Sequence, residues 1–114
     1  MKLLHIHAQP HWHAEAYIVG NSEGLKALRD AIDKALENGH AATPHDEKPV
    51  FVTDGEGYVV HVVKNDDKWD GESWNKAALP YTDEIAQYGY EGKIGPWDMV
   101  PEEYWEALRE SYNK

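Results

Sequence analysis

The chain has 114 residues, a size that allows one hydrophobic core and excludes two independently stable halves, so we expect a single domain over residues 1–114. Hydrophobic and charged fractions of 41% and 28% exclude a disordered chain. The formal net charge of −10 disfavours direct binding to a nucleic-acid duplex, and the absence of cysteine excludes disulfides and thiolate sites.

The same composition bears on location and partners. No apolar run is long enough to span a membrane, and the first residues lack the apolar core of a signal peptide, so we expect a cytoplasmic protein that makes no membrane contact. Residues 65–114 carry twelve acidic and five basic side chains. This acidic part favours either simple solubility or the attraction of a basic protein partner.

The first twenty residues alternate apolar and polar side chains, as half-buried strands do. The pattern predicts strands over residues 2–7 and 12–19, joined by a three-residue turn at 8–10. In that register His7 lies opposite His11 and His5 opposite His13, so all four imidazoles share one face. The opposite face is then apolar and consists of Leu4, Ile6, Trp12, Ala14, Ala16 and Ile18.

Helical periodicity is strongest over residues 22–38, where apolar side chains recur every three or four positions. Asn21 or Ser22 can cap the first turn, and Gly39 can end the helix in a left-handed conformation. We expect this amphipathic helix to pack on the apolar face of the first hairpin.

After a polar loop at residues 40–49, residues 50–53 and 58–64 predict a second hairpin around the turn at 54–57. Residues 65–100 follow no long period and predict an irregular aromatic-rich segment in which a short helix begins at Thr82. A C-terminal helix is predicted over residues 101–112, with an inward face of Tyr104, Trp105, Leu108 and Tyr112.

The fold class that these elements indicate is α+β. A small antiparallel sheet is built from two hairpins in the order β-β-α-β-β over residues 1–64, and one amphipathic helix packs on a face of it. The acidic, aromatic-rich segment and the C-terminal helix are expected to pack on that unit.

The shared histidine face is the first candidate site. Imidazole nitrogens bind Zn²⁺, Ni²⁺ or Cu²⁺, and Glu15 could add a carboxylate oxygen. The same face, which Tyr17 continues, could instead contact a small ligand or another subunit, or simply be polar. No established metalloprotease or cupin pattern completes the set, so the sequence requires no cofactor.

Exposed aromatic residues form the second candidate site. Trp69, Trp74 and Trp97 stand beside Gly, Pro and acidic residues, and we expect them to contact a ligand or partner. The other aromatic residues of the C-terminal part are expected to divide between the core and such contacts. His61, alone among valines, is interpreted as a polar strand residue rather than a catalytic base.

The sequence lacks a nucleophile elbow, a phosphate-binding loop and a dinucleotide fingerprint, so it favours a protein that is not an enzyme. The first hypothesis is a small binding protein, of the inhibitor or immunity type, that sequesters a small ligand such as a nucleotide or blocks a basic protein target. The alternative is a metal-binding domain or small metal-dependent enzyme that uses His5, His7, His11 and His13. A homo-oligomer is expected, because outward histidines and exposed Trp side chains suit a symmetric partner.

Overall fold

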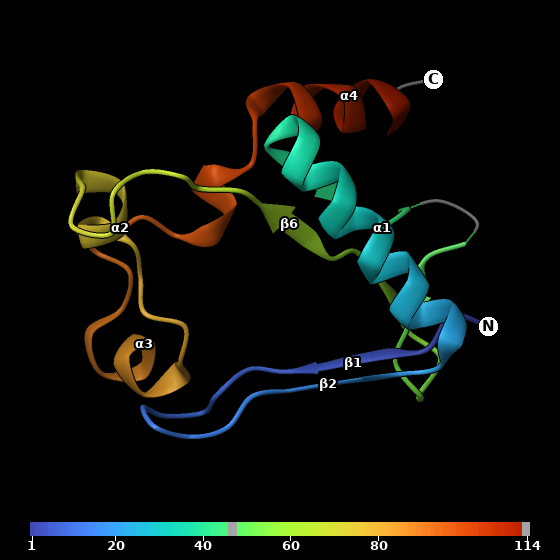
Figure 1. The fold of residues 1–114 in the computed structure, drawn as a ribbon, viewed down its shortest axis with the longest axis horizontal. Helices are drawn as coiled ribbons and strands as arrows, with labels where there is room; N and C mark the ends of the chain where they lie inside the picture. The colour runs from blue at the N-terminus through green and yellow to red at the C-terminus, as the bar shows by residue number, and fades with distance from the viewer. Residues whose placement is uncertain (46–47, 113–114) are drawn as a thin grey trace.

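Helices and short antiparallel strand pairs make up the part of the chain that the computed structural model describes, residues 1–45 and 48–112 (Figure 1). The predicted α+β class is confirmed. Residues 46–47, inside the predicted polar loop, lie outside the described residues. The elements are β1 (Leu4–His7), β2 (Tyr17–Gly20), α1 (Ser22–Asn38), β3 (His40–Ala42), β4 (Val50–Phe51), β5 (Gly57–Tyr58), β6 (His61–Val63), α2 (Glu72–Lys76), α3 (Thr82–Tyr88), the 3₁₀ helix η1 (Pro96–Met99) and α4 (Glu102–Tyr112).

The described strands pair two by two, β1 with β2, β3 with β6 and β4 with β5, and every pair is antiparallel. The predicted second hairpin is therefore shorter than expected. Its last residues, β6, leave the hairpin and pair with β3, a strand inside the segment predicted to be a polar loop. An isolated bridge between Leu3 and Phe51 joins the β1 end to β4, where the Phe51 amide donates to the Lys2 carbonyl at 2.8 Å.

The register predicted for the first hairpin is wrong. His5 lies opposite Val19 and His7 opposite Tyr17, so residues 8–16 form a long connection instead of a three-residue turn. Part of the segment predicted as the second strand is bent, because His13 has a left-handed φ of 64° and the Ala14 amide donates to the His11 carbonyl at 3.1 Å. Alternating apolar and polar residues in a bent loop give the same sequence pattern as a strand.

Helix α1 has the predicted bounds, and both of its predicted caps are found. The side-chain oxygen of Asn21 accepts from the Gly24 amide at 2.9 Å, and Gly39 ends the helix with a φ of 92°. The first turn lies against the β1 backbone so closely that a Cβ at Gly24 would come within 1.9 Å of the Leu3 carbonyl oxygen. The cap residue Asn21 and Gly24, the only glycine of α1, therefore fix the position of this helix.

The core lies where α1 meets several strands. Its central buried residues are Leu4 of β1, Leu28 of α1 and Val50 of β4, and Ala27, Tyr58, Val60 and Val62 pack against them. The expected apolar face of the first hairpin is only partly covered, because Ile6 and Ile18 remain exposed. Beyond Leu4, most of this hairpin extends away from the core (Figure 1).

The C-terminal half is held by backbone bonds between short segments. The Ala78 amide donates to the Ile94 carbonyl at 2.9 Å, which ties α2 to the strand-like segment before η1. The predicted helix at Thr82 is present as α3, and the Thr82 hydroxyl donates to the Pro10 carbonyl at 2.9 Å. The loop of the first hairpin thus reaches α3 (Figure 1).

The predicted C-terminal helix is present as α4, and β6 lies between this helix and the first hairpin in the view of Figure 1. Tyr104, Trp105 and Leu108 are half-buried as predicted, whereas Tyr112 is 76% exposed and is not buried with them. Within the described residues, no helix has the length and hydropathy that a membrane crossing requires.

Candidate functional site

The structure separates the four histidines that the predicted register had brought together. His5 and His7 remain neighbours on β1, with ring centroids 5.9 Å apart. The Nε2 atom of His5 accepts from the Thr53 amide at 3.1 Å, so that nitrogen is occupied by the protein backbone. His11 and His13 lie in the long connection, where Trp12 packs on the His13 ring at 4.3 Å.

This arrangement bears on the predicted metal site. Over residues 1–45 and 48–112, no three side chains of His, Asp or Glu are placed to hold a metal ion together. The expected partner, Glu15, accepts a hydrogen bond from the Tyr17 hydroxyl instead. That bond is the main reason why the pKa of Tyr17 is raised, with burial as the smaller cause.

Three of the predicted residues, His7, Glu15 and Tyr17, line a broad, open depression of about 750 Å³ on the first hairpin. Its remaining lining residues also belong to this hairpin, namely Ala8, Pro10, Ala14 and Val19. The depression is therefore the curved surface of one hairpin rather than a site enclosed by several elements.

The three predicted tryptophans are exposed, but they do not meet. Trp69 is 85% exposed in the loop before α2, and Trp97 of η1 packs edge-to-face on Tyr90 at 4.8 Å. Trp74 of α2 lines an apolar pocket of about 390 Å³, together with Ile85 and Ile94 among others. Their role in binding stays a prediction.

A different pair of histidines is brought together by the fold. His40 opens β3 and His61 opens β6, and the antiparallel register puts them on the same face of this strand pair. The Nε2 atom of His40 lies 3.0 Å from the Nδ1 atom of His61, with the rings inclined by only 22°. One imidazole donates to the other, so the two rings act as a unit.

Helix α4 covers this pair with aromatic rings. Tyr104 packs edge-on against both imidazoles, at 5.3 Å from the His40 ring and 5.0 Å from the His61 ring. Trp105 approaches the His61 ring at 5.4 Å and the Tyr104 ring at 5.1 Å. The edge-on geometry is the favoured one for aromatic pairs, so α4 is fixed here by specific contacts.

Burial favours the neutral forms of His40, His61 and Tyr104 in this cluster. It lowers the pKa of His40. It also lowers the pKa of His61, and the charge that His40 would carry lowers that pKa as well. Burial also raises the pKa of Tyr104, to which Tyr112 adds, and the pKa of Tyr58. Each shift favours the neutral form, as desolvation does.

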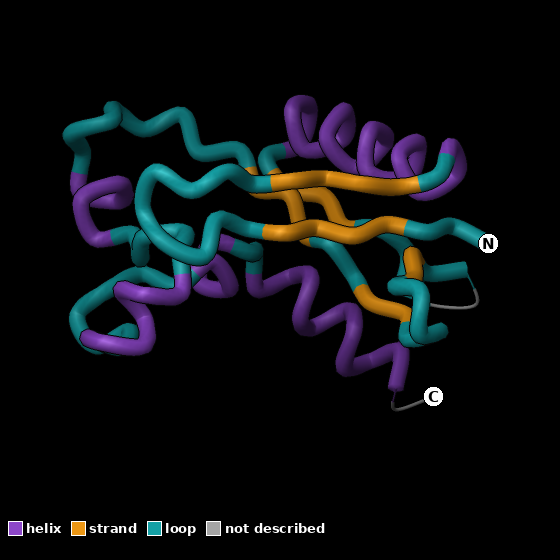
Figure 2. The backbone as a smooth tube through the Cα atoms, turned by 90° about the horizontal axis from the view of Figure 1, so that it is seen from below, coloured by secondary structure: helices purple, strands orange, loops and turns teal. Residues whose placement is uncertain are grey.

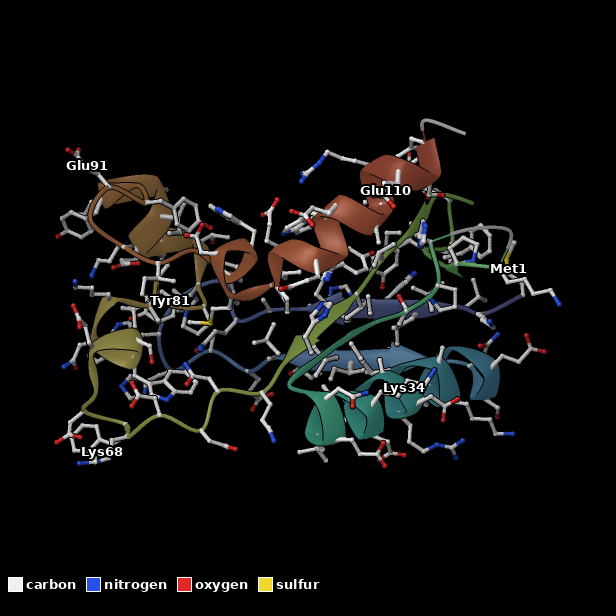
Figure 3. All side chains as sticks on the ribbon, turned by 90° about the horizontal axis from the view of Figure 1, so that it is seen from above. Met1, Lys34, Lys68, Tyr81, Glu91 and Glu110 are labelled. Carbon is white, nitrogen blue, oxygen red and sulfur yellow. The ribbon has the colours of Figure 1, made fainter. Side chains whose placement is uncertain are left out.

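An open groove of about 290 Å³ lies between α4 and the strand residues beside it, and we call it the α4 groove. Figure 3 shows α4, on which Glu110 is labelled, running alongside β6. The groove is lined chiefly by rings and apolar side chains: His45, Pro49, Tyr58, Val59, His61, Tyr104, Trp105, Leu108 and Tyr112. It is the place where side chains from β5, β6 and α4 converge.

The sequence pattern predicts only one side of this groove. It indicates the inward residues of the C-terminal helix but not their counterpart, because His40 lies in a segment expected to be a loop and His61 has the pattern of an ordinary polar strand residue. The available signal was the aromatic face of the C-terminal helix, which requires a surface to cover.

No family model, no curated protein and no solved structure matches this chain. Its function is therefore inferred from the side chains described above.

Proposed function

We propose that this chain is a small non-enzymatic protein that binds and sequesters an uncharged nucleobase or nucleoside in the α4 groove. The observation that supports this most strongly is the lining itself: aromatic rings from α4 and two strands, with imidazole and phenol groups whose pKa shifts favour their neutral forms. Flat rings stack on flat ligands, and neutral imidazole and phenol groups can donate and accept hydrogen bonds.

Charge favours an uncharged ligand over a nucleotide. Among the described lining residues there is no Lys or Arg that could contact a phosphate. The chain as a whole carries a net charge of −10, and α4 itself bears Glu102, Glu103, Glu106 and Glu110. A phosphate would therefore approach a negative field without a compensating partner.

The lining also supports binding without catalysis. Nucleophilic and acid-base catalysis by histidine requires a neighbouring nucleophile, or a carboxylate that orients the ring. The described lining of the α4 groove supplies no Ser, Asp, Glu or Lys beside His61. The Nδ1 atom of His61 lies 3.0 Å from the Nε2 atom of His40, so it is paired with a second imidazole rather than with a nucleophile or a carboxylate.

The alternative, a metal-binding domain or metal-dependent enzyme built on the N-terminal histidines, has less support. It needs ligands that converge, and of those four histidines only His5 and His7 share a strand. Blocking of a basic protein target through Trp69 also has less support, because this side chain is 85% exposed and does not line the apolar pocket that contains Trp74.

Isothermal titration calorimetry with adenosine and guanosine, each compared with its 5′-monophosphate, tests the proposal. We expect the nucleosides to bind more tightly than the monophosphates, and Trp105→Leu to weaken nucleoside binding about fivefold or more, since stacking of one base contributes about 1–3 kcal/mol. The matched control is Trp69→Leu, which removes an indole outside the groove and should leave binding unchanged.

Two results would contradict the proposal. One is the absence of heat from any nucleoside at about millimolar concentration, where even weak sites fill. The other is equal loss of binding in Trp105→Leu and Trp69→Leu. The urea midpoint of each variant shows whether a loss of binding comes from unfolding instead.

A further inference from the structure

The outer strand of the first hairpin is unpaired on its outer edge among the described strands, and side chains on both of its faces are partly exposed. Among the described strands, β2 pairs only with β1. Three consecutive residues of β2 are more than half exposed, Tyr17 at 54%, Ile18 at 57% and Val19 at 59%. In Figure 2, β2 is the strand that runs into α1, and β1, which leads from the N-terminus, lies on its other side.

The direction of the free backbone groups follows from the ladder. The Asn21 amide donates to the Leu3 carbonyl at 3.1 Å, so these two opposed residues form a hydrogen-bonded pair. Bonded and non-bonded pairs alternate along an antiparallel ladder, and Tyr17 and Val19 are therefore bonded inward to β1. The amide and carbonyl of Ile18, between them, point outward from the edge.

Three common forms of edge protection, namely Lys, Pro and a β-bulge, are missing from β2. Natural edges carry Lys, Pro or a bulge that prevents pairing with another chain. The strand Tyr17–Gly20 contains neither Lys nor Pro, and its pairing with β1 is regular over all four residues. An exposed, regular and apolar edge of this kind is a template for a further strand.

We propose that a second copy of this chain pairs with β2 in antiparallel fashion, about a twofold axis at Ile18. The outward amide and carbonyl of Ile18 then bond to those of Ile18 in the second copy. Tyr17 meets Val19 of the second copy on one face, and Val19 meets its Tyr17, which are favourable aromatic and β-branched pairs. The surface is thus complementary to itself, as a twofold interface requires.

Charge also favours a second copy at this place. The chain has a net charge of −10, and most of its surface repels an identical molecule. Residues 1–20, however, contain only Lys2 and Glu15 as charged side chains apart from the histidines and the N-terminus. Two copies therefore approach each other with the least repulsion along the first hairpin.

Sedimentation equilibrium over a range of concentrations tests the association directly. We expect a concentration-dependent dimer for the wild type and a monomer for Ile18→Pro, because proline removes the outward amide while the bonds of β2 to β1 use other residues. If Ile18→Pro loses its fold in urea unfolding, Ile18→Lys takes its place, since it sets two like charges at the twofold axis. A wild type that stays monomeric at about 0.5 mM, or a folded variant that still forms the dimer, overturns the proposal.

Cross-linking tests the geometry, since the native chain has no cysteine. Two Ile18→Cys chains paired at a hydrogen-bonded position would have Cα atoms about 5.5 Å apart, within the span of a disulfide. We expect mild oxidation to link Ile18→Cys into a dimer and to leave the control Leu36→Cys, whose parent side chain is 60% exposed on α1, unlinked. Equal linking of both variants would mean random collision and would overturn the twofold pairing.

Discussion

The Nε2 atom of His40 and the Nδ1 atom of His61 lie 3.0 Å apart, although 21 positions separate the two residues in the chain. This contact joins the first residue of β3 to the first residue of β6, and Tyr104 of α4 packs on both rings. The pair therefore links a two-stranded ladder to the helix that covers it, and His61 also lines the α4 groove.

The first prediction concerns pH. Burial lowers the pKa of both His40 and His61 in the folded protein, so the unfolded chain takes up protons first as the pH falls through about 6.5. The contribution of the neutral pair to the free energy of unfolding is therefore complete above that pH, and the free energy of unfolding decreases below it. Urea unfolding should show a lower midpoint at about pH 5.5 than at about pH 7.5.

Variants separate this pair from other sources of pH dependence. A double variant, His40→Gln and His61→Gln, should show a smaller difference between the two midpoints, whereas His11→Gln, in the exposed loop, should keep the full difference. Tyr104, the titratable side chain packed on both rings, stays protonated throughout this range because its pKa is raised. An undiminished difference in the double variant would rule out the pair as the origin.

The second prediction concerns the cap of α1. The Oδ1 atom of Asn21 accepts from the Gly24 amide at 2.9 Å and from the Leu3 amide at 3.0 Å, and its Nδ2 atom donates to the Met1 carbonyl at 2.7 Å. Asn21→Ala should lower the free energy of unfolding by about 1–2 kcal/mol, the cost of a lost cap. Asn21→Asp should cost less, because it keeps the acceptor and loses only the donor.

The control for the cap is Ser22→Ala, since sequence alone allowed either residue to be the cap. Ser22 is the first residue of α1 and makes no side-chain cap bond among the described contacts. Its replacement should change stability by no more than about 0.5 kcal/mol. A larger loss from Ser22→Ala than from Asn21→Ala, measured by urea unfolding, would contradict this assignment.

Local signals explain why α1 was predicted with the correct bounds and the first hairpin with the wrong register. The helix has its period, its cap and its terminal glycine within its own sequence. The pairing of β1 depends on where β2 begins, and residues 12–16 alternate like a strand although His13 is left-handed. Nothing in a single sequence shows that a bend interrupts such a pattern.

Only the α4 side of the candidate site could be predicted from the sequence, again because only that side has a local pattern. Tyr104 and Trp105 follow a helical period, so their inward orientation could be inferred from α4 alone. His40 and His61 become neighbours only through the pairing of β3 with β6. The sequence pattern predicts a loop where β3 lies and a hairpin strand where β6 lies, so it does not indicate this pairing. Contacts between distant strands leave no local pattern, and that half of the site required the structure.

The last prediction concerns Thr43, which is 2% exposed and extends the β3–β6 ladder past its last strand residue. Its amide donates to the Val60 carbonyl at 3.0 Å, and its hydroxyl oxygen accepts from the Val60 amide at 2.8 Å. Thr43→Val keeps the shape of the side chain but leaves the Val60 amide without an acceptor. The free energy of unfolding should therefore fall by about 1–3 kcal/mol.

Thr43→Ser distinguishes the hydrogen bond from packing, because it keeps the oxygen and removes one methyl group, which contributes about 0.8 kcal/mol when buried. We expect Thr43→Ser to be more stable than Thr43→Val in urea, and the Val60 amide to exchange with deuterium faster in Thr43→Val alone. If Thr43→Val were the more stable of the two, the methyl contacts would outweigh the bond. The start of β6, and with it the position of His61, would then depend on packing rather than on this side-chain acceptor.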